Sequence, residues 1–159
     1  MTLLLFSRLT LVAGALLLVG CSSFERDWRA SGRRPELRSF ARGDAFAGRW
    51  EGRWTSASHR LGSGYAGGRL RCLLARIDER RYEARFKANW MIFTSSYRTI
   101  FDVERRGPVL QLDGQHRLSA MFGGVYHYRG RVTPQHFEAT YDSSYDRGTF
   151  DLRRAESGR

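Results

Sequence analysis

The residues of this chain that could perform acid–base or metal chemistry are scattered. Its four histidines are His59, His116, His127 and His136. No two of them have the spacing that zinc sites use, and Cys72 has no second cysteine near it in the sequence to complete a ligand set. The sequence therefore predicts neither a metal site nor a cofactor.

The acidic and hydroxyl residues near the C-terminus also lack a catalytic pattern. Asp142 and Asp146 flank a predicted turn, but two carboxylates fall short of the six to eight oxygen ligands of calcium, so we interpret them as turn residues. Ser143 and Ser144 lie outside any nucleophile-elbow motif. His59, in a loop rich in Gly and Ser, is the remaining candidate for catalysis, and a solvated loop histidine is favoured over it. We therefore expect no enzyme.

The N-terminal residues 1–20 have the layout of a secretory signal peptide. Arg8 is the only charge, and the apolar run that follows over residues 9–20 is shorter than the roughly 20 residues needed to span a membrane. A charged start, a short apolar centre and small residues at the exit are typical of a cleaved signal. We predict that residues 1–20 are removed.

The exit of this segment, Leu18-Val19-Gly20-Cys21, resembles the lipobox of bacterial lipoproteins. The resemblance implies that the Cys21 thiol receives diacylglycerol, that the chain is cut before it, and that the new amine is often acylated. Two or more acyl chains anchor a protein stably. By the sorting rule of lipoproteins in double-membrane bacteria, which the resemblance brings with it, Ser22 in place of Asp favours the outer membrane, with the protein facing the periplasm; a host with a single membrane is the alternative. An ordinary signal peptide, or a buried helix, with a chance cysteine is the alternative.

The mature chain is basic. Its 139 residues suffice for one domain with a core. The full chain has a formal net charge of +11, and Lys87 is its only lysine. A basic surface favours anionic partners such as lipid headgroups, lipopolysaccharide or nucleic acid, and export argues against nucleic acid. With Cys21 lipidated, Cys72 has no disulfide partner, and its apolar surroundings predict a buried, inert thiol.

Residues 21–44 are interpreted as a lipidated tether. They are polar and charged and lack a sustained hydrophobic period, with at most one helical turn after Pro35. Fully stretched, the tether would reach about 70 Å. Its arginines could lie against an anionic membrane, each contributing about 1 kcal/mol close to the surface. A solvated linker is the alternative.

From Phe46 onward, apolar and polar residues alternate, which predicts half-buried antiparallel strands. We expect strands at 46–55, 69–78, 81–90, 96–105, 109–113, 115–121, 124–132, 136–142 and 147–154. Asp113-Gly114, between two leucine-containing segments, is the strongest hairpin signal. The prediction for residues 45–156 is an all-β domain, an antiparallel up-and-down barrel of eight or nine strands, because closure removes exposed edges. A sandwich is the alternative.

Two motifs resemble those of lipocalin-like and calycin-like barrels. Gly48-Arg49-Trp50 looks like the Gly-x-Trp signature of lipocalins, and residues 130–141 with 146–152 are similar to the closing hairpin of small calycin-like domains. Residues 46–154 as a whole resemble uncharacterised small bacterial lipoproteins with a Gly-x-Trp-x-Gly-x-Trp opening. The resemblance implies a barrel with one closed end and no known activity.

A dozen aromatic residues fall on the predicted inner face. They are Phe46, Trp50, Trp54, Tyr82, Phe86, Trp90, Phe101, Tyr126, Tyr128, Phe137, Tyr141 and Phe150. An eight-stranded barrel can be filled by such side chains or can hold one small ligand. The rings favour a filled interior, whereas Gly48, Gly52, Ala84 and Ala88 on the same faces could open a pocket. Both interpretations remain open.

The candidate ligand-binding residues are Trp50, Trp54, Phe86, Trp90, Tyr126 and Tyr128. The apolar run Trp90-Met91-Ile92-Phe93 could line the barrel mouth or enter a bilayer, or could belong to a strand covered on both faces.

The function that we expect is that of a membrane-anchored envelope lipoprotein, with a domain that binds an apolar or lipid-like ligand or another envelope component. The alternative is a structural or assembly lipoprotein with a filled barrel and no small ligand.

Overall fold

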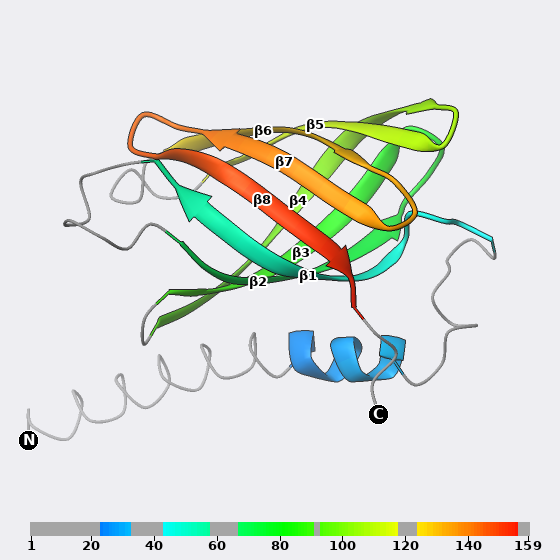
Figure 1. Cartoon of the computed structure of the whole chain (residues 1–159), viewed down its shortest axis with the longest axis horizontal. Helices are drawn as coiled ribbons and strands as arrows, with labels where there is room; N and C mark the ends of the chain where they lie inside the picture. The colour runs from blue at the N-terminus through cyan, green and yellow to red at the C-terminus, as the bar shows by residue number, and fades with distance from the viewer. Residues whose placement is uncertain (1–22, 33–42, 58–66, 91–92, 118–123, 156–159) are drawn as a thin grey trace, which may run out of the picture.

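The computed structural model describes residues 23–32, 43–57, 67–90, 93–117 and 124–155, and these form eight strands and one helix (Figure 1). The strands are β1 (Gly48–Ser56), β2 (Gly67–Arg76), β3 (Arg81–Trp90), β4 (Phe93–Arg106), β5 (Val109–Arg117), β6 (Val125–Val132), β7 (His136–Asp142) and β8 (Arg147–Arg154). Each strand pairs antiparallel with the next, and β1 pairs with β8. The predicted up-and-down barrel is confirmed, and it is consistent with a lipocalin-like barrel.

The alternation of residue types sets which side chains enter the barrel. Trp50 pairs with Cys72, Cys72 with Phe86, and Phe86 with Tyr97, so a row of inward side chains crosses four strands. The intervening residues face outward, as the period of two requires. Cys72 is a free, fully buried thiol whose pKa burial raises well above its usual value, in agreement with the predicted inert cysteine.

The hairpin predicted at Asp113-Gly114 is wrong. Both residues lie within β5, where Asp113 pairs with Asp102 and Gly114 pairs with Phe101. A Cβ at position 114 would lie 2.7 Å from Cδ1 of Phe101, so the glycine makes room for a ring instead of forming a turn. The β4–β5 turn is at Gly107, whose φ of 60° suits glycine.

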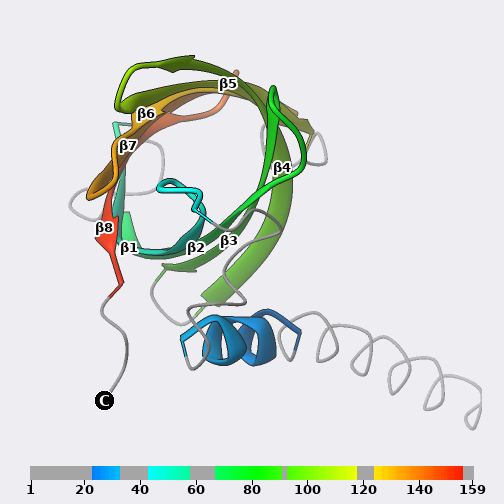
Figure 2. The same ribbon diagram turned by 90° about the vertical axis from the view of Figure 1, so that its right-hand side faces the viewer.

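One end of the barrel is covered by residues 43–47, here called the plug, which lie within the ring of strands in Figure 2. Asp44 accepts hydrogen bonds from the Phe46 amide at 2.8 Å and from the Tyr82 hydroxyl at 2.5 Å. The indole of Trp50 donates to the Phe46 carbonyl at 3.1 Å. These hydrogen bonds hold the plug against β1 and β3 at this end of the barrel.

Arg154 joins the end of β8 to this plug. Its guanidinium lies 4.0 Å from the centre of the Trp50 ring and donates to the carbonyls of Ala47 at 2.6 Å and Pro134 at 2.9 Å. It also donates to the Ala45 carbonyl. These contacts fix the plug to the last strand.

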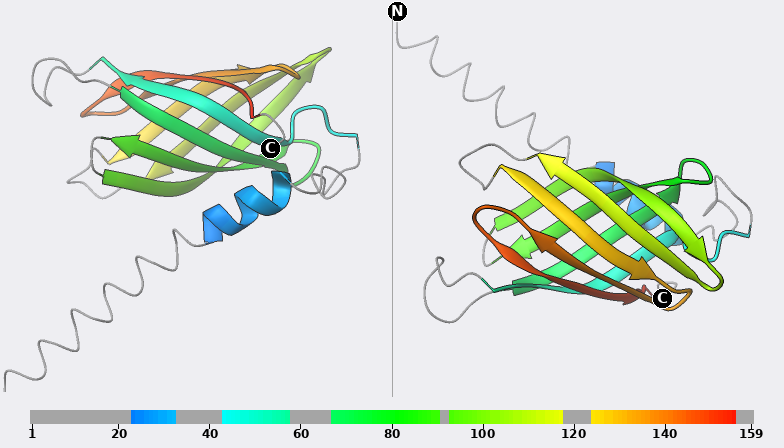
Figure 3. Two further views of the ribbon diagram at one scale, coloured as in Figure 1. Left: turned by 60° about the horizontal axis from the view of Figure 1, so that its bottom comes forward. Right: turned by 90° about the horizontal axis from the view of Figure 1, so that it is seen from above.

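Residues 23–32 form a helix on the outside of the barrel, beside β2 and β3 (Figures 1 and 3). Phe24 and Trp28 pack with Leu73 of β2 in a small apolar cluster. The tether interpretation of residues 21–44 did not include this helix, because its apolar face consists of only two residues four positions apart. The turn considered after Pro35 lies outside the described residues, and the role of the segment as a tether stays a prediction.

Candidate binding site at the mouth end of the barrel

The interior near the plug and at the centre of the barrel is filled. Fully buried side chains are Trp50, Leu70, Cys72, Ala84, Phe86, Phe101, Val132, Phe137 and Leu152, each with 0% of its surface exposed. The Phe86 ring packs edge-on against Phe101 and Phe137 with centroids 6.3 Å apart in both pairs, and Trp50 packs edge-on against Phe137 at 6.0 Å. These are the preferred geometries of aromatic cores.

The opposite end, which we call the mouth end, is where β1, β3, β5 and β7 finish. Its inward side chains are Trp54, Ala88, Tyr97, His116, Tyr126, Tyr128 and Tyr141. Trp54, Tyr97, His116 and Tyr126 are only partly buried, in contrast to the rings of the filled half. The barrel therefore presents partly exposed aromatic groups at this end alone among the described parts of its interior.

The rings of the mouth end form one continuous group contributed by four neighbouring strands. Tyr97 of β4 lies 5.4 Å from the ring centre of His116 of β5 and 6.5 Å from Tyr128 of β6. Tyr126 of β6 lies 6.4 Å from Tyr128 and 5.9 Å from Tyr141 of β7. The alternation within each strand directs these side chains inward at neighbouring levels. We call this group the tyrosine wall.

The tyrosine wall ends at a polar cluster formed by β1 and the β7–β8 turn. Asp146 accepts hydrogen bonds from the Ser56 hydroxyl at 2.5 Å and from the Tyr141 hydroxyl at 2.9 Å. The Asp146 amide donates to Ser143 Oγ at 3.0 Å, and the Ser143 amide donates to the Asp146 carbonyl at 2.8 Å. Asp146 therefore acts as a turn residue, as its sequence context predicted.

Burial favours the uncharged form of four side chains of the tyrosine wall. Burial raises the pKa of Tyr128 to about 12 and raises the pKa of Tyr97 well above its usual value. The pKa of Tyr141 is raised by burial and by its hydrogen bond to Asp146. Burial lowers the pKa of His116, which favours the neutral imidazole. The wall thus offers apolar rings with uncharged hydroxyl groups.

The structure divides the six candidate residues between the two halves of the barrel. Trp50 and Phe86 belong to the filled core, where each is fully buried. Trp54, Tyr126 and Tyr128 lie at the mouth end. The side chain of Trp90 lies outside the described residues, as do Met91 and Ile92 of the apolar run.

Three members of the tyrosine wall, Tyr97, His116 and Tyr141, were absent from the six candidate ligand-binding residues, although Tyr141 was among the predicted inward aromatic residues. His116 follows Gly114 at an interval of two on the inner face of β5, and the hairpin wrongly placed at Asp113-Gly114 concealed that alternation. Tyr97 precedes Thr99 and Phe101 at the same interval, and this pattern could have indicated it.

The other histidines lie apart from the tyrosine wall. His127 is exposed on the outer face of β6, as its position between Tyr126 and Tyr128 predicted. His136 is on the outer surface, with Nε2 2.9 Å from Oδ1 of Asp151. His59 lies outside the described residues. Where the structure describes the chain, no three His, Cys, Asp or Glu side chains gather as a potential metal site.

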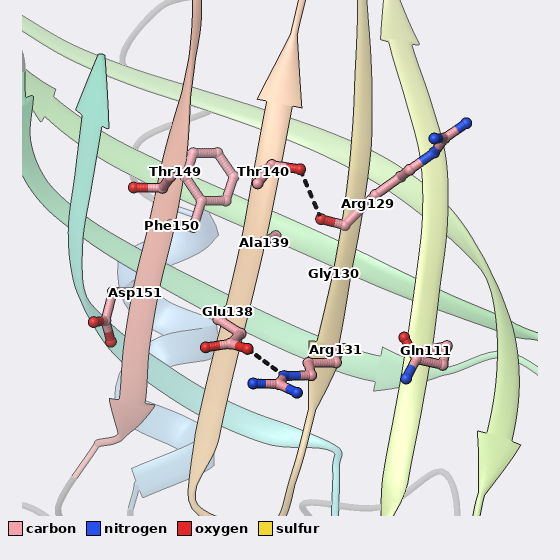
Figure 4. Close-up of a pocket in the computed structure, with 10 residues that line it drawn as sticks. All are labelled: Gln111, Arg129, Gly130, Arg131, Glu138, Ala139, Thr140, Thr149, Phe150 and Asp151. Carbon is pink, nitrogen blue, oxygen red and sulfur yellow. Dashed lines mark hydrogen bonds and ion pairs between the residues drawn. The ribbon is translucent and has the colours of Figure 1, made fainter. Parts of the chain in front are cut away.

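A hollow lies on the outer face of β5–β8 (Figure 4). Its polar lining includes the ion pair between Arg131 and Glu138. The Thr140 hydroxyl donates to the Arg129 carbonyl at 3.3 Å. Because these groups bond one another on an open surface, the hollow lacks the apolar enclosure typical of a small-molecule site.

Comparisons of this chain with protein-family models, with curated proteins and with solved structures find no match. No helix within the described residues is long and apolar enough to cross a membrane.

Proposed function

We propose that this chain is an outer-membrane lipoprotein, anchored through acyl chains on Cys21 and facing the periplasm, with a barrel that binds an apolar or lipid-like ligand at its mouth end. The ligand is bound noncovalently, and no covalent bond forms or breaks. The observation that supports the proposal is the contrast between the filled half of the interior and the partly exposed tyrosine wall.

The chemistry of the tyrosine wall favours a neutral or weakly polar, elongated ligand. Stacked rings provide apolar surface for a hydrocarbon or ring system, and burial of such surface contributes about 25 cal/mol per Å². The phenol groups of the partly exposed Tyr97 and Tyr126 can donate to or accept from a hydroxyl, ester or carboxyl group. An apolar pocket with few polar groups is the usual form of a lipid-binding site.

The test is an inventory of molecules bound to the purified protein. We expect mass spectrometry of organic extracts to find an apolar species with the wild-type protein and to find it depleted in the double variant Tyr97→Ala/Tyr126→Ala. Tyr145→Ala is the matched control, because Tyr145 is an exposed tyrosine in the β7–β8 turn. Absence of any bound species, together with failure to take up a fluorescent fatty acid, would contradict the carrier function.

A structural or assembly role is the second candidate, and the filled half of the barrel favours it. The rings of Trp50, Phe86, Phe101 and Phe137 leave no exposed surface on themselves. Under this alternative the outer face of the barrel binds another envelope component. Crosslinking in intact cells followed by purification through the lipoprotein would recover a defined partner, whereas the carrier function predicts a small molecule instead.

A further inference from the structure

The helix of residues 23–32 is held to the barrel by apolar contacts. Phe24 and Trp28 are 2% and 9% exposed, and their rings stack with centroids 5.7 Å apart. They cover Leu73, whose side chain faces outward from β2. Arg71 of the same strand lies over both rings, 5.5 Å from Phe24 and 5.1 Å from Trp28.

Ion pairs hold the same helix from two strands. Glu25 pairs with Arg71 of β2 and, at 2.6 Å, with Lys87 of β3. Asp27 pairs with Arg85 of β3 at 2.6 Å. The hydrogen bond from Arg71 is the main reason that the pKa of Glu25 is lowered to about 2, so the carboxylate is charged at neutral pH. Residues 24–28 of the helix are thus held by both apolar contacts and ion pairs.

The face of the helix that points away from the barrel is basic. Arg26 and Arg29 are exposed on the side opposite Phe24 and Trp28, and the Arg26 side chain is 77% exposed. Ala30 is exposed beside them. Glu25 pairs with cations of the barrel, and Asp27 pairs both with Arg85 of the barrel and with Arg26 at 3.6 Å, which leaves Arg29 and the remaining charge of Arg26 on the outer face. The outer face therefore has a charge that complements anionic headgroups.

The start of this helix is close in sequence to the proposed lipid. Cys21 precedes Ser23 by two residues, so their Cα atoms lie within about 7 Å even in a fully extended chain. Arg85 Nη2 lies 3.5 Å from the Ser23 hydroxyl, which places the helix start over β3. Acyl chains on Cys21 would consequently enter the bilayer beside the β2–β3 wall, and not at the end of a long tether.

We infer that the outer face of helix 23–32 lies against an anionic bilayer and holds the barrel in one orientation, with the β2–β3 wall toward the membrane. The inference rests on the proposed lipidation of Cys21. The opposite wall, formed by β6 and β7, then faces the periplasm (Figure 2). The hollow of Figure 4 lies on that periplasmic side.

Energy transfer to the bilayer tests this orientation. Full-length lipoprotein carries one introduced cysteine for a donor dye, either Arg69→Cys on the outer face of β2 or Thr140→Cys on that of β7; both positions are exposed, and buried Cys72 does not react. The protein is reconstituted in phosphatidylcholine–phosphatidylglycerol vesicles with an acceptor on the lipid headgroups. We expect clearly stronger transfer from position 69 than from position 140. Equal transfer from both would overturn the orientation.

Two sets of variants identify what sets the orientation. Phe24→Ser/Trp28→Ser removes the apolar contacts of the helix and should abolish the difference between positions 69 and 140, while Phe24→Leu/Trp28→Leu should retain it. Arg26→Gln/Arg29→Gln should weaken the difference, as should vesicles without phosphatidylglycerol. A difference that survives in the double-serine variant would show that the helix does not orient the barrel.

Flotation of the same vesicles separates failure of the inference from failure of the proposed anchor. Wild-type protein should float, and Cys21→Ser should not. Wild-type protein that fails to float refutes the lipid anchor and the orientation together. Protein that floats but shows equal transfer from positions 69 and 140 refutes the orientation alone.

Discussion

The guanidinium of Arg154 joins three parts of the barrel end: the plug, Trp50 of β1 and the β6–β7 turn. It stacks on Trp50 and donates to carbonyls on both sides of the barrel end. A cation over an indole and charge-assisted hydrogen bonds are each stronger than their neutral counterparts. Arg154 therefore helps to close the barrel end, because it donates to backbone carbonyls that lie outside the strands.

Replacing Arg154 with Ala should destabilise the protein by about 2–4 kcal/mol, because the Trp50 ring and three carbonyls lose their partner. Urea unfolding followed by tryptophan fluorescence measures the change. The adjacent Arg153 is exposed, so Arg153→Ala should change the free energy of unfolding by less than about 0.5 kcal/mol. Equal effects of the two substitutions would argue against the role of Arg154 in closing the barrel.

Gly114 makes room for a ring of the core. An alanine there would place its Cβ 2.7 Å from Phe101 Cδ1 and 3.0 Å from the Ile100 carbonyl oxygen. We expect Gly114→Ala to cost about 1–3 kcal/mol through overpacking, measured by urea unfolding. Asp113→Asn, at a side chain that is 72% exposed, is the neighbouring control with little expected effect. A neutral Gly114→Ala would indicate that Phe101 can move aside freely.

At the scale of single elements, alternation in the sequence predicted most strands to within two or three residues, because inward residues of a barrel must be apolar and outward ones polar. It failed at Asp113-Gly114, where a close approach to Phe101 and a hairpin turn require the same residue type. The tyrosine wall was predicted in part for a related reason. Alternation shows that Trp50 and Trp54 both face inward, but only register and strand tilt show which one reaches the mouth end.

The helix of residues 23–32 escaped prediction because its stability is tertiary. Ten residues form a marginal helix in isolation. Its apolar face has two residues, and the rest of its binding comes from Glu25 and Asp27 with cations that lie 46 to 62 residues away in the sequence. A local sequence pattern does not reveal ion-pair partners that are so far away in the chain.

Docking of this helix should depend on pH through Glu25. Its folded-state pKa of about 2 lies below the ordinary value of 4.5, so the carboxylate contributes stability above about pH 4.5 that is lost as the pH falls toward 2. Hydrogen exchange at the amides of residues 24–32 should therefore report progressive undocking over that range. Glu25→Gln should reduce the dependence and leave the part that comes from Asp27, whose pKa is lowered by its hydrogen bond from Arg85. Glu79→Gln, on a residue in the β2–β3 turn, should leave it unchanged.

At the scale of the whole molecule, the helix needs the barrel for its contacts, whereas the core of the barrel does not include the helix. The eight strands form a closed ring of hydrogen bonds, and the plug enters that ring from residues 43–47. The helix contacts only the outer surface, through Leu73 and the cations of β1–β3. The barrel core, from Trp50 to Leu152, receives no side chain from the helix.

A chain that begins at Gly43 should consequently fold into the same barrel. Loss of the helix exposes Leu73 and leaves Arg71, Arg85 and Lys87 solvated, but water satisfies those cations. We expect the free energy of unfolding to fall by only about 1–3 kcal/mol, because burial of Phe24 and Trp28 is largely offset by the entropy of ordering ten residues. Circular dichroism and hydrogen exchange should show unchanged strand content and strand protection. A collapsed state without strand protection would instead show that the helix is an integral part of the fold. The β2–β3 wall would then require the contacts of residues 23–32 in order to form.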